Sequence, residues 1–210
     1  MYDFILSELS NLNILLFHMI NQGMGNVLFD FIMPLITDLG SFLAWILICV
    51  FLFLFGGKNG RRVAVLALAA LFMSNVIVYL LKIIVALPRP FLVLPDVDVL
   101  VSVNEIYSFP SGHSASSFAA ALVIGLRYKL NFREKSYGLI YPLLAFAVII
   151  GFSRIYIGVH YPFDVLFGAL VGIFSALLIL KVEDNKIVDK LTHIPLLDKL
   201  TLKRIKNFFT

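Results

Sequence analysis

The chain has 210 residues, of which 60% are hydrophobic and only 14% are charged, and its mean hydropathy is +0.97. This balance excludes an ordinary soluble globular domain and predicts an integral membrane protein. The formal net charge is +4, and the single cysteine, Cys49, excludes both a disulfide framework within the chain and a thiolate metal site. Several apolar runs reach the roughly 20 residues that a helix needs to cross a bilayer, so we expect an all-α fold.

The first half of the chain predicts three membrane segments. Residues 4–22 are apolar but interrupted by polar side chains, which is typical of either a marginal span or an interfacial amphipathic helix. Residues 27–55 are too long for one upright helix and carry Pro34 and Gly40, which predicts a kink or a short lead-in helix before a span. Residues 63–87 form the next span, which ends at the two prolines of LPRP.

The second half predicts three further spans after a polar, acidic loop at residues 89–109. These spans are expected over residues 111–126, 137–152 and 161–180, with a basic turn between the first two. The sequence therefore predicts a bundle of about six transmembrane helices, of which the first is marginal.

The positive charges predict the orientation of this bundle. Fourteen of the 17 Lys and Arg residues lie in the turns at residues 58–62 and 127–135 or in the tail from residue 181. Alternation of the spans places all fourteen on one side, which the positive-inside rule makes cytoplasmic. The basic residues and histidines that fall at the opposite, outer face are Lys82, Arg89, Arg154, His113 and His160.

Two regions follow from this organisation, a membrane-embedded domain over residues 1–182 and a basic cytoplasmic tail over residues 183–210. The tail mixes Lys and Arg with Ile, Leu and Phe, which favours an amphipathic segment lying on the anionic cytoplasmic leaflet. A solvated tail that only fixes the topology is an equal alternative.

The residues gathered at the outer face predict a phosphate site. Lys82, Arg89 and Arg154 would repel one another unless an anion lay between them, and guanidinium groups match phosphate oxygens well. Ser111 and Gly112 follow a proline where a helix is expected to begin, so their backbone N–H groups and the Ser111 hydroxyl can point at an oxyanion.

Two histidines complete a displacement mechanism. His160 and Asp164 stand four residues apart, so a helix from about residue 159 would place them on one face, where the carboxylate fixes the tautomer of the imidazole. His160 is then the expected nucleophile towards phosphorus and His113 the general acid, with water later cleaving the phosphohistidine. This chemistry requires neither a metal nor another cofactor.

The segments KIIVALPRP, PSGH and SRIYIGVHYPFD resemble the three motifs of the type 2 phosphatidic acid phosphatase superfamily, KxxxxxxRP, PSGH and SRxxxxxHxxxD, and match every motif position. The resemblance implies a six-helix membrane fold and metal-independent hydrolysis of lipid phosphates. It also implies a role for each matched residue: phosphate binding by Lys82, Arg89, Ser111, Gly112 and Arg154, acid catalysis by His113, nucleophilic attack by His160 and support of that nucleophile by Asp164.

We therefore expect a multi-pass plasma-membrane phosphatase with its active site at the outer face. The expected substrate is a polyprenyl (undecaprenyl-type) diphosphate or phosphatidylglycerophosphate or phosphatidate, and the sequence does not choose between them. The expected partners are this lipid and the bilayer, with no nucleic acid, and the sequence carries no signal for the oligomeric state. The alternative is a lipid or anion transporter that uses the basic cluster to bind headgroups, which would be expected to need polar residues through the bilayer or inverted repeats; neither is seen.

Five other polar positions near the predicted site carry open interpretations. Ser153 either binds phosphate or packs beside Arg154, and Asp38 is expected to cap a helix in preference to contacting a headgroup. Asp96, Asp98 and Glu105 are expected in a solvated loop, although carboxylates near a phosphate site could repel some headgroups.

Overall fold

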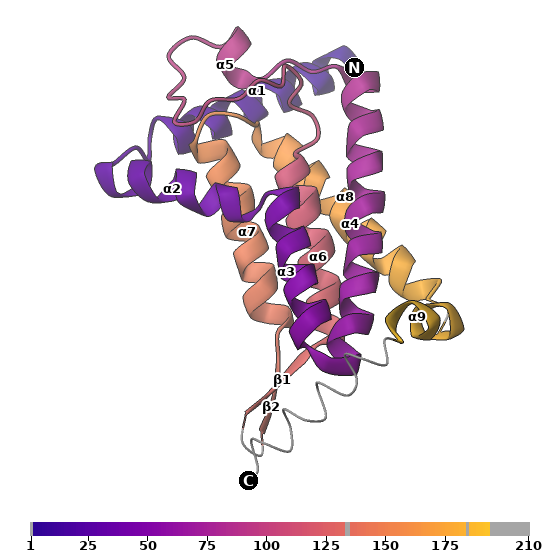
Figure 1. The fold of residues 1–210 in the computed structure, drawn as a ribbon. Helices are drawn as coiled ribbons and strands as arrows, with labels where there is room; N and C mark the ends of the chain where they lie inside the picture. The colour runs from indigo at the N-terminus through magenta and orange to yellow at the C-terminus, as the bar shows by residue number, and fades with distance from the viewer. Residues whose placement is uncertain (1, 133–134, 184, 194–210) are drawn as a thin grey trace.

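The computed structural model describes residues 2–132, 135–183 and 185–193. Its elements are α1 (Tyr2–Asn21), α2 (Val27–Leu39), α3 (Phe42–Phe55), α4 (Gly57–Val85), α5 (Pro90–Val93), α6 (Gly112–Arg127), β1 (Lys129–Phe132), β2 (Lys135–Gly138), α7 (Ile140–Tyr156), α8 (Pro162–Lys181) and α9 (Asn185–Thr192). Helices α3, α4, α6, α7 and α8 run alongside one another, whereas α1 and α2 lie across one end of this bundle (Figure 1). The predicted helical fold is confirmed, and the basic turn before α7 adds a short antiparallel hairpin that was not predicted.

Helix α6 is the centre of the bundle and packs against α3, α4, α7 and α8. Its contact with α8 is close because α8 presents glycines at that interface. A Cβ atom at Gly168 would lie 2.4 Å from the carbonyl oxygen of Ser111, and one at Gly172 would lie 2.3 Å from that of Ala115. Small residues let membrane helices approach closely enough for their backbones to touch. This packing fixes the start of α6 against the start of α8.

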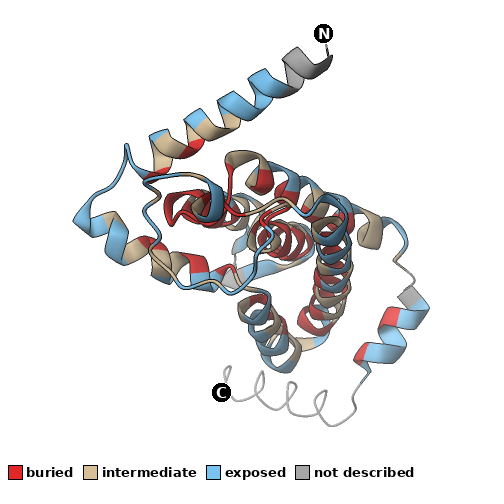
Figure 2. Cartoon of the chain, turned by 90° about the horizontal axis from the view of Figure 1, so that it is seen from above, coloured by how far each residue is buried: buried red, intermediate tan, exposed pale blue. Residues whose placement is uncertain are grey.

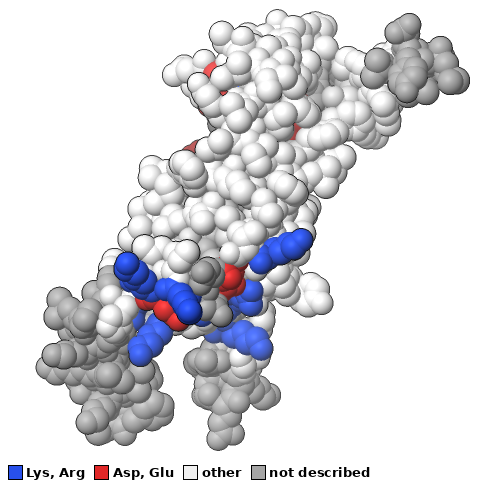
Figure 3. All heavy atoms as spheres, turned by 90° about the vertical axis from the view of Figure 1, so that its right-hand side faces the viewer, with Lys and Arg blue, Asp and Glu red and all other residues white. Residues whose placement is uncertain are grey.

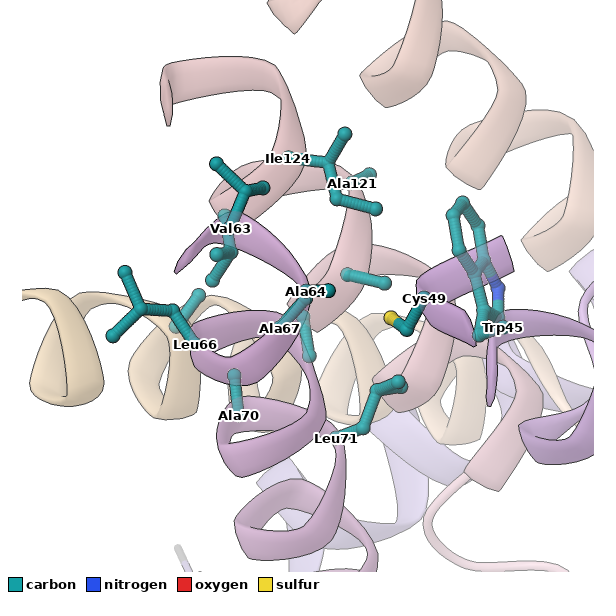
Figure 4. Close-up of a cluster of buried hydrophobic side chains, with 14 of the residues drawn as sticks. Trp45, Cys49, Val63, Ala64, Leu66, Ala67, Ala70, Leu71, Ala121 and Ile124 are labelled. Atoms are coloured by element: carbon teal, nitrogen blue, oxygen red, sulfur yellow. The ribbon is translucent and has the colours of Figure 1, made fainter. Parts of the chain in front are cut away.

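The main core lies between α3, α4 and α6, and it is built largely from small side chains. Figure 4 shows Cys49 among Trp45, Ala64 and Leu71, all of which are buried. Trp45 also donates a hydrogen bond from Nε1 to the Ser117 hydroxyl at 3.1 Å, a type of contact worth about 0.6 kcal/mol on average between membrane helices. Cys49 is therefore a core residue.

The outward faces of the bundle are apolar and exposed. Viewed along the bundle, buried residues lie on the inward faces of the helices and exposed residues on the outward faces (Figure 2). The exposed side chains include Leu47, Phe51, Val148 and Phe174. Exposed apolar surface of this extent is typical of contact with lipid. The structure thus has the character of a membrane protein.

The long apolar stretch at residues 27–55 is broken, as its proline and glycine predict. Helices α2 and α3 meet at an angle of 56°, and the Ser41 hydroxyl caps α3 by accepting a hydrogen bond from the Ala44 N–H at 3.1 Å. A Cβ atom at Gly40 would lie 2.2 Å from Cγ2 of Ile150 on α7. The glycine therefore lets the corner pack against α7, and Ser41 rather than Asp38 is the cap.

Among the residues that the structure describes, two helices, α4 and α8, are long and apolar enough to cross a membrane, and α2 with α3 would make a third if the bent pair counts as one span. The expected number of six spans stays a prediction. Helix α1 favours the interfacial alternative, because it runs across the end of the bundle and away from it (Figures 1 and 2). Its C-terminal end is held there by Phe17, which packs on Tyr161, and by Asn21, whose amide donates to the Tyr156 carbonyl at 2.7 Å.

Lys and Arg side chains gather at the end of the bundle opposite α1 (Figure 3). Glu183 joins two of them there, accepting from Arg62 Nε at 2.8 Å and from Arg127 Nη2 at 2.8 Å. Helix α9 belongs to the predicted tail and is described by the structure. It packs against α4, and its Val188 is buried. Residues 194–210, with Lys199, Lys203, Arg204 and Lys206, and Arg133 in the hairpin turn lie outside the described residues.

Candidate active site

The three motif segments meet at the end of the bundle that carries α1. They border a cavity of about 630 Å³, whose wall also includes Thr37 and Asp38 of α2 and Asn75 of α4. The predicted site residues that line this cavity are Lys82, Arg89, Gly112, His113, Arg154 and His160. Ser111 and Asp164 are fully buried beside them. Predicted site residues that are up to 78 positions apart in the sequence therefore border one cavity.

Arg89 lies where the chain turns after α4, and its side chain is buried. Its Nε donates to the Glu105 carbonyl at 2.7 Å and its Nη1 donates to the Val159 carbonyl at 2.9 Å. Burial lowers the pKa of Arg89, and the nearby Glu105 carboxylate opposes this effect. An arginine remains charged at neutral pH even so. Arg89 thus places a positive charge at the wall of the cavity. Its hydrogen bonds also connect the loop before α6 with the segment between α7 and α8.

His160 and Asp164 are adjacent, but not because they share a helix. Helix α8 begins at Pro162, and His160 lies in the connection before it. Asp164 turns back instead to accept the N–H of Tyr161, the N-cap of α8, at 2.8 Å. This capping geometry brings Asp164 Oδ2 to 3.4 Å from His160 Nδ1. The pairing that the spacing predicts is present, and its expected origin in a helix from residue 159 was wrong.

The hydrogen bonds around His160 indicate its protonation state. His160 Nε2 lies 3.3 Å from Nη1 of Arg89, which can only donate, so Nε2 is assigned as the acceptor and Nδ1 carries the proton towards Asp164. Burial, followed by the charges of Arg154, Arg89 and Lys82, lowers the pKa of His160 well below 6.5. The imidazole is therefore neutral near pH 7, with its lone pair on Nε2, the nitrogen beside Arg89.

His160 and Asp164 are adjacent but do not form a normal hydrogen bond in this structure. Among the described residues, His160 Nδ1 and Asp164 Oδ1 are buried and make no hydrogen bond, although His160 Nδ1 lies 3.4 Å from Asp164 Oδ2. Catalytic hydrogen bonds are often long without substrate and shorten in the reacting complex. The two groups need to approach by only a few tenths of an ångström to make a normal hydrogen bond.

Gly112 and His113 form the first turn of α6, and both border the cavity. A Cβ atom at Gly112 would meet only Cγ1 of Val78, at an ordinary 3.7 Å, so packing does not demand a glycine here. The space that Gly112 leaves open belongs to the cavity, beside the N–H groups of a helix N-terminus. This turn can therefore approach an anion closely.

Ser111 lies one residue earlier and is the N-cap of α6. Its hydroxyl accepts hydrogen bonds from the Ser114 N–H at 3.4 Å and from the Ser114 hydroxyl at 3.1 Å. Its side chain is buried behind the cavity wall, so the contact to phosphate expected of its hydroxyl stays a prediction. The role that the geometry gives Ser111 is to start the helix that carries Gly112 and His113.

Arg154 ends α7 and is held by a residue that the sequence did not single out. Its Nη1 donates to the Thr37 hydroxyl on α2 at 2.9 Å, whereas its buried Nε has no hydrogen-bond partner in the described part of the chain. Arg154 thus borders the cavity and keeps one buried N–H donor without a partner among the described residues. Its neighbour Ser153 donates to the Ile150 carbonyl at 2.7 Å and is fully buried, which supports the packing alternative for Ser153. No local pattern marks Thr37, because it contacts a residue 117 positions away.

Lys82 has an unexpected partner in the cavity. Its Nζ donates to the Tyr107 carbonyl at 2.9 Å and to Glu105 Oε2 at 2.6 Å, and Arg89 Nη2 donates to the same oxygen at 3.0 Å. Burial raises the pKa of Glu105, but the hydrogen bonds and charges of Lys82 and Arg89 outweigh it and lower the pKa overall. The expectation that Glu105 belongs to a merely solvated loop was wrong.

Comparisons with known proteins identify the family of this chain. The family model of the PAP2 superfamily matches residues 63–187, more than half of the chain. The chain belongs to the PAP2 superfamily. It is 33% identical to the undecaprenyl-diphosphatase BcrC of Bacillus subtilis, over 85% of this chain and 89% of that one. The resemblance of the three motifs is thus confirmed.

Two solved structures share the fold. The crystal structure of Aquifex aeolicus LpxE matches with a TM-score of 0.68 and 34% identity over 81% of this chain and 95% of that one. The transmembrane PAP2-type phosphatidylglycerolphosphate phosphatase of Bacillus subtilis matches with a TM-score of 0.66 and 23% identity over 85% and 89%. The PAP2 protein described here is a membrane phosphatase acting on lipid phosphates. A shorter match, 43% identical over 43% of this chain, is to the bacitracin transport permease protein BcrC of Bacillus licheniformis, so the transporter alternative is named among the relatives.

Proposed function

We propose that this PAP2 phosphatase hydrolyses a polyprenyl diphosphate at the outer membrane face, without a metal, through a phosphohistidine on His160. The observation that carries the mechanism is the placement of His160, with a neutral Nε2 beside Arg89 and Nδ1 towards Asp164. The relative that supports the substrate is the undecaprenyl-diphosphatase, which is similar over most of both chains.

The first step is attack of His160 Nε2 on the terminal phosphorus. The P–O bond to the leaving group breaks, and His113 donates a proton to the departing oxygen, which is worth about 100- to 10,000-fold in rate. Lys82, Arg89 and Arg154 hold the remaining oxygens and stabilise their charge. Asp164 stabilises the imidazolium that forms on His160.

The second step returns the enzyme to its starting state. Water attacks the phosphohistidine while His113, now neutral, accepts a proton from it, and inorganic phosphate leaves. Each step requires His113 in a different protonation state, so the same side chain serves first as acid and then as base.

The outer location rests on the two ends of the molecule being chemically different. Lys and Arg side chains gather at the end of the bundle opposite α1 (Figure 3), where Arg62 and Arg127 both contact Glu183. The positive-inside rule assigns such an end to the cytoplasm. The cavity then opens at the extracytoplasmic face. The lipid tail of a substrate would lie in the bilayer, against the exposed apolar faces of the helices.

The substrate and mechanism can be tested together with purified protein in detergent and a chelator. Phosphate release is measured from a long-chain polyprenyl diphosphate, phosphatidylglycerophosphate, phosphatidate and a lipid A 1-phosphate, and the highest kcat/KM is expected for the diphosphate. Preference for phosphatidylglycerophosphate or phosphatidate would favour the second candidate, and complete loss of activity with EDTA would refute a metal-independent reaction.

Two variants test the roles of the histidines. His160→Ala is expected to abolish turnover and the acid-labile phosphoenzyme that a denaturing quench traps, and turnover retained by this variant would sink the mechanism. His113→Ala is expected to lose far less of its phosphoenzyme formation with p-nitrophenyl phosphate than with an alkyl phosphate, because an acidic leaving group needs no proton. Equal losses with both substrates would contradict acid catalysis by His113.

A further inference from the structure

Glu105 places a carboxylate oxygen on two of the proposed phosphate ligands at once. Its Oε2 lies 2.6 Å from Lys82 Nζ and 3.0 Å from Arg89 Nη2. A single anionic oxygen bridging an ammonium and a guanidinium group reproduces the contacts that a phosphoryl oxygen would make with them. The carboxylate therefore competes for the same donors as a phosphate.

Most of the N–H donors that the structure assigns to Arg89 and Lys82 are directed at the loop before α6. Arg89 uses Nε on the Glu105 carbonyl, Nη1 on Val159 and Nη2 on the Glu105 carboxylate. Lys82 uses one further donor on the Tyr107 carbonyl. Lys82 Nζ has three N–H donors and Arg89 Nη2 has two, so each keeps one beyond these bonds. A phosphate that is to use the N–H groups now directed at Glu105 must take the place of its carboxylate.

The carboxylate lies on the solvent side of its partners, so it can leave. The Glu105 side chain is 67% exposed, whereas those of Lys82 and Arg89 are 15% and 2% exposed. Water screens the exposed Glu105 carboxylate, so its release costs little compared with what a phosphate gains from the buried cations. The lowered pKa of Glu105 keeps the carboxylate charged at neutral pH.

We propose that Glu105 is a specificity-determining internal competitor, which occupies part of the phosphate site in the resting enzyme and is displaced by the phosphoryl group of the substrate. This inference rests on the proposed role of Lys82 and Arg89 as phosphate ligands. Glu105 weakens the binding of every phosphate by the cost of its displacement and by repulsion between like charges. A lipid substrate is concentrated in the bilayer beside the site, whereas free inorganic phosphate is not. The penalty is the same for both, but the lipid overcomes it through its high local concentration, whereas the product and other soluble phosphates do not.

The test compares Glu105→Gln with wild type and with Asp96→Asn, which removes the same charge from an exposed position in the same loop. Competitive inhibition by inorganic phosphate and by vanadate is measured together with KM and kcat for the lipid substrate. Glu105→Gln is expected to lower the Ki of phosphate by about 3- to 10-fold, since the loss of two exposed ion pairs and a repulsion amounts to roughly 1 kcal/mol. KM is expected to fall as well, kcat not to rise, and Asp96→Asn to leave all three constants unchanged.

Other outcomes overturn the inference. An unchanged Ki in Glu105→Gln would show that the carboxylate does not compete, and a raised Ki with a lower kcat/KM would show that Glu105 positions Lys82 and Arg89 for phosphate. An equal fall in Asp96→Asn would show a general effect of net charge. Glu105→Asp keeps the charge and should retain a Ki near that of wild type, and thermal unfolding of each variant in detergent checks that it is folded. If wild-type protein neither hydrolyses the lipid panel nor binds phosphate, the proposed function fails; if it does both, only the role of Glu105 is at stake.

Discussion

The backbone N–H of Ser111 donates a hydrogen bond to the carbonyl oxygen of Asp164 at 2.9 Å. This bond joins the N-cap of α6 to the first turn of α8, so the segment that carries His113 and the dyad of His160 and Asp164 are held in a fixed relation. The close approach that permits it depends on Gly168, one turn further along α8, where the Ser111 carbonyl leaves no room for a side chain.

Gly168→Ala is expected to separate these two helices and lower both stability and activity. The added methyl group would lie 2.4 Å from a backbone oxygen, and overpacking of this kind costs about 1 to 3 kcal/mol. Thermal unfolding in detergent and kcat/KM measure the two effects. The matched control is Gly138→Ala, because a Cβ atom at Gly138 has nothing within 4 Å. Equal behaviour of the two variants would contradict a role for Gly168 in the packing of α6 on α8.

Asp164→Asn is expected to lower kcat by about 100- to 10,000-fold, because an amide no longer favours the tautomer that leaves His160 Nε2 free to attack. The amide oxygen can still accept the Tyr161 N–H, so the cap of α8 and the thermal stability should be largely kept. KM is expected to change little, since Asp164 lies behind the cavity wall. A variant that unfolds at a much lower temperature, with kcat of the folded fraction unchanged, would make Asp164 a structural cap only.

The pH dependence of kcat/KM is expected to show the effect of burial on His160. Protonation of His160 removes the nucleophile, and its lowered pKa means that the neutral form persists as the pH falls through 6.5. The acid limb that belongs to the enzyme should therefore lie below pH 6.5. Ionisation of the substrate phosphate also gives an acid limb. A series of substrates that differ in the pKa of this phosphate separates it from the limb of His160, because only the substrate's limb shifts along the series. A stationary limb at or above pH 6.5 would contradict the predicted protonation state.

Cysteine labelling is expected to show the orientation of the bundle. In a Cys49→Ser background, which removes a buried thiol, Val99→Cys places a thiol on the loop beside the cavity and Lys58→Cys places one at the basic end. A membrane-impermeant maleimide should label the first variant in intact cells and the second only after permeabilisation. The reverse pattern would put the active site in the cytoplasm.

The membrane character and the site residues could be predicted from the sequence because their signals are local. An apolar run of sufficient length forms a helix wherever the bilayer excludes water from the backbone, and the spacing of Lys82, Arg89, His113, Arg154 and His160 is visible in three short motifs. The break between α2 and α3 could be predicted for the same reason, since Pro34 and Gly40 act on their own stretch of chain.

The tertiary structure decided the contacts between segments, which no short stretch of sequence carries. The spacing of His160 and Asp164 predicts that they pair, but only the start of α8 at Pro162 shows that a helix cap brings them together. Thr37 reaches Arg154 because α2 packs on α7. Glu105 resembles any acidic loop residue until the turn after α4 places Lys82 and Arg89 beneath it. Such contacts depend on how closely helices approach, and that is set by small residues such as Gly168, which act on a partner far away in the chain.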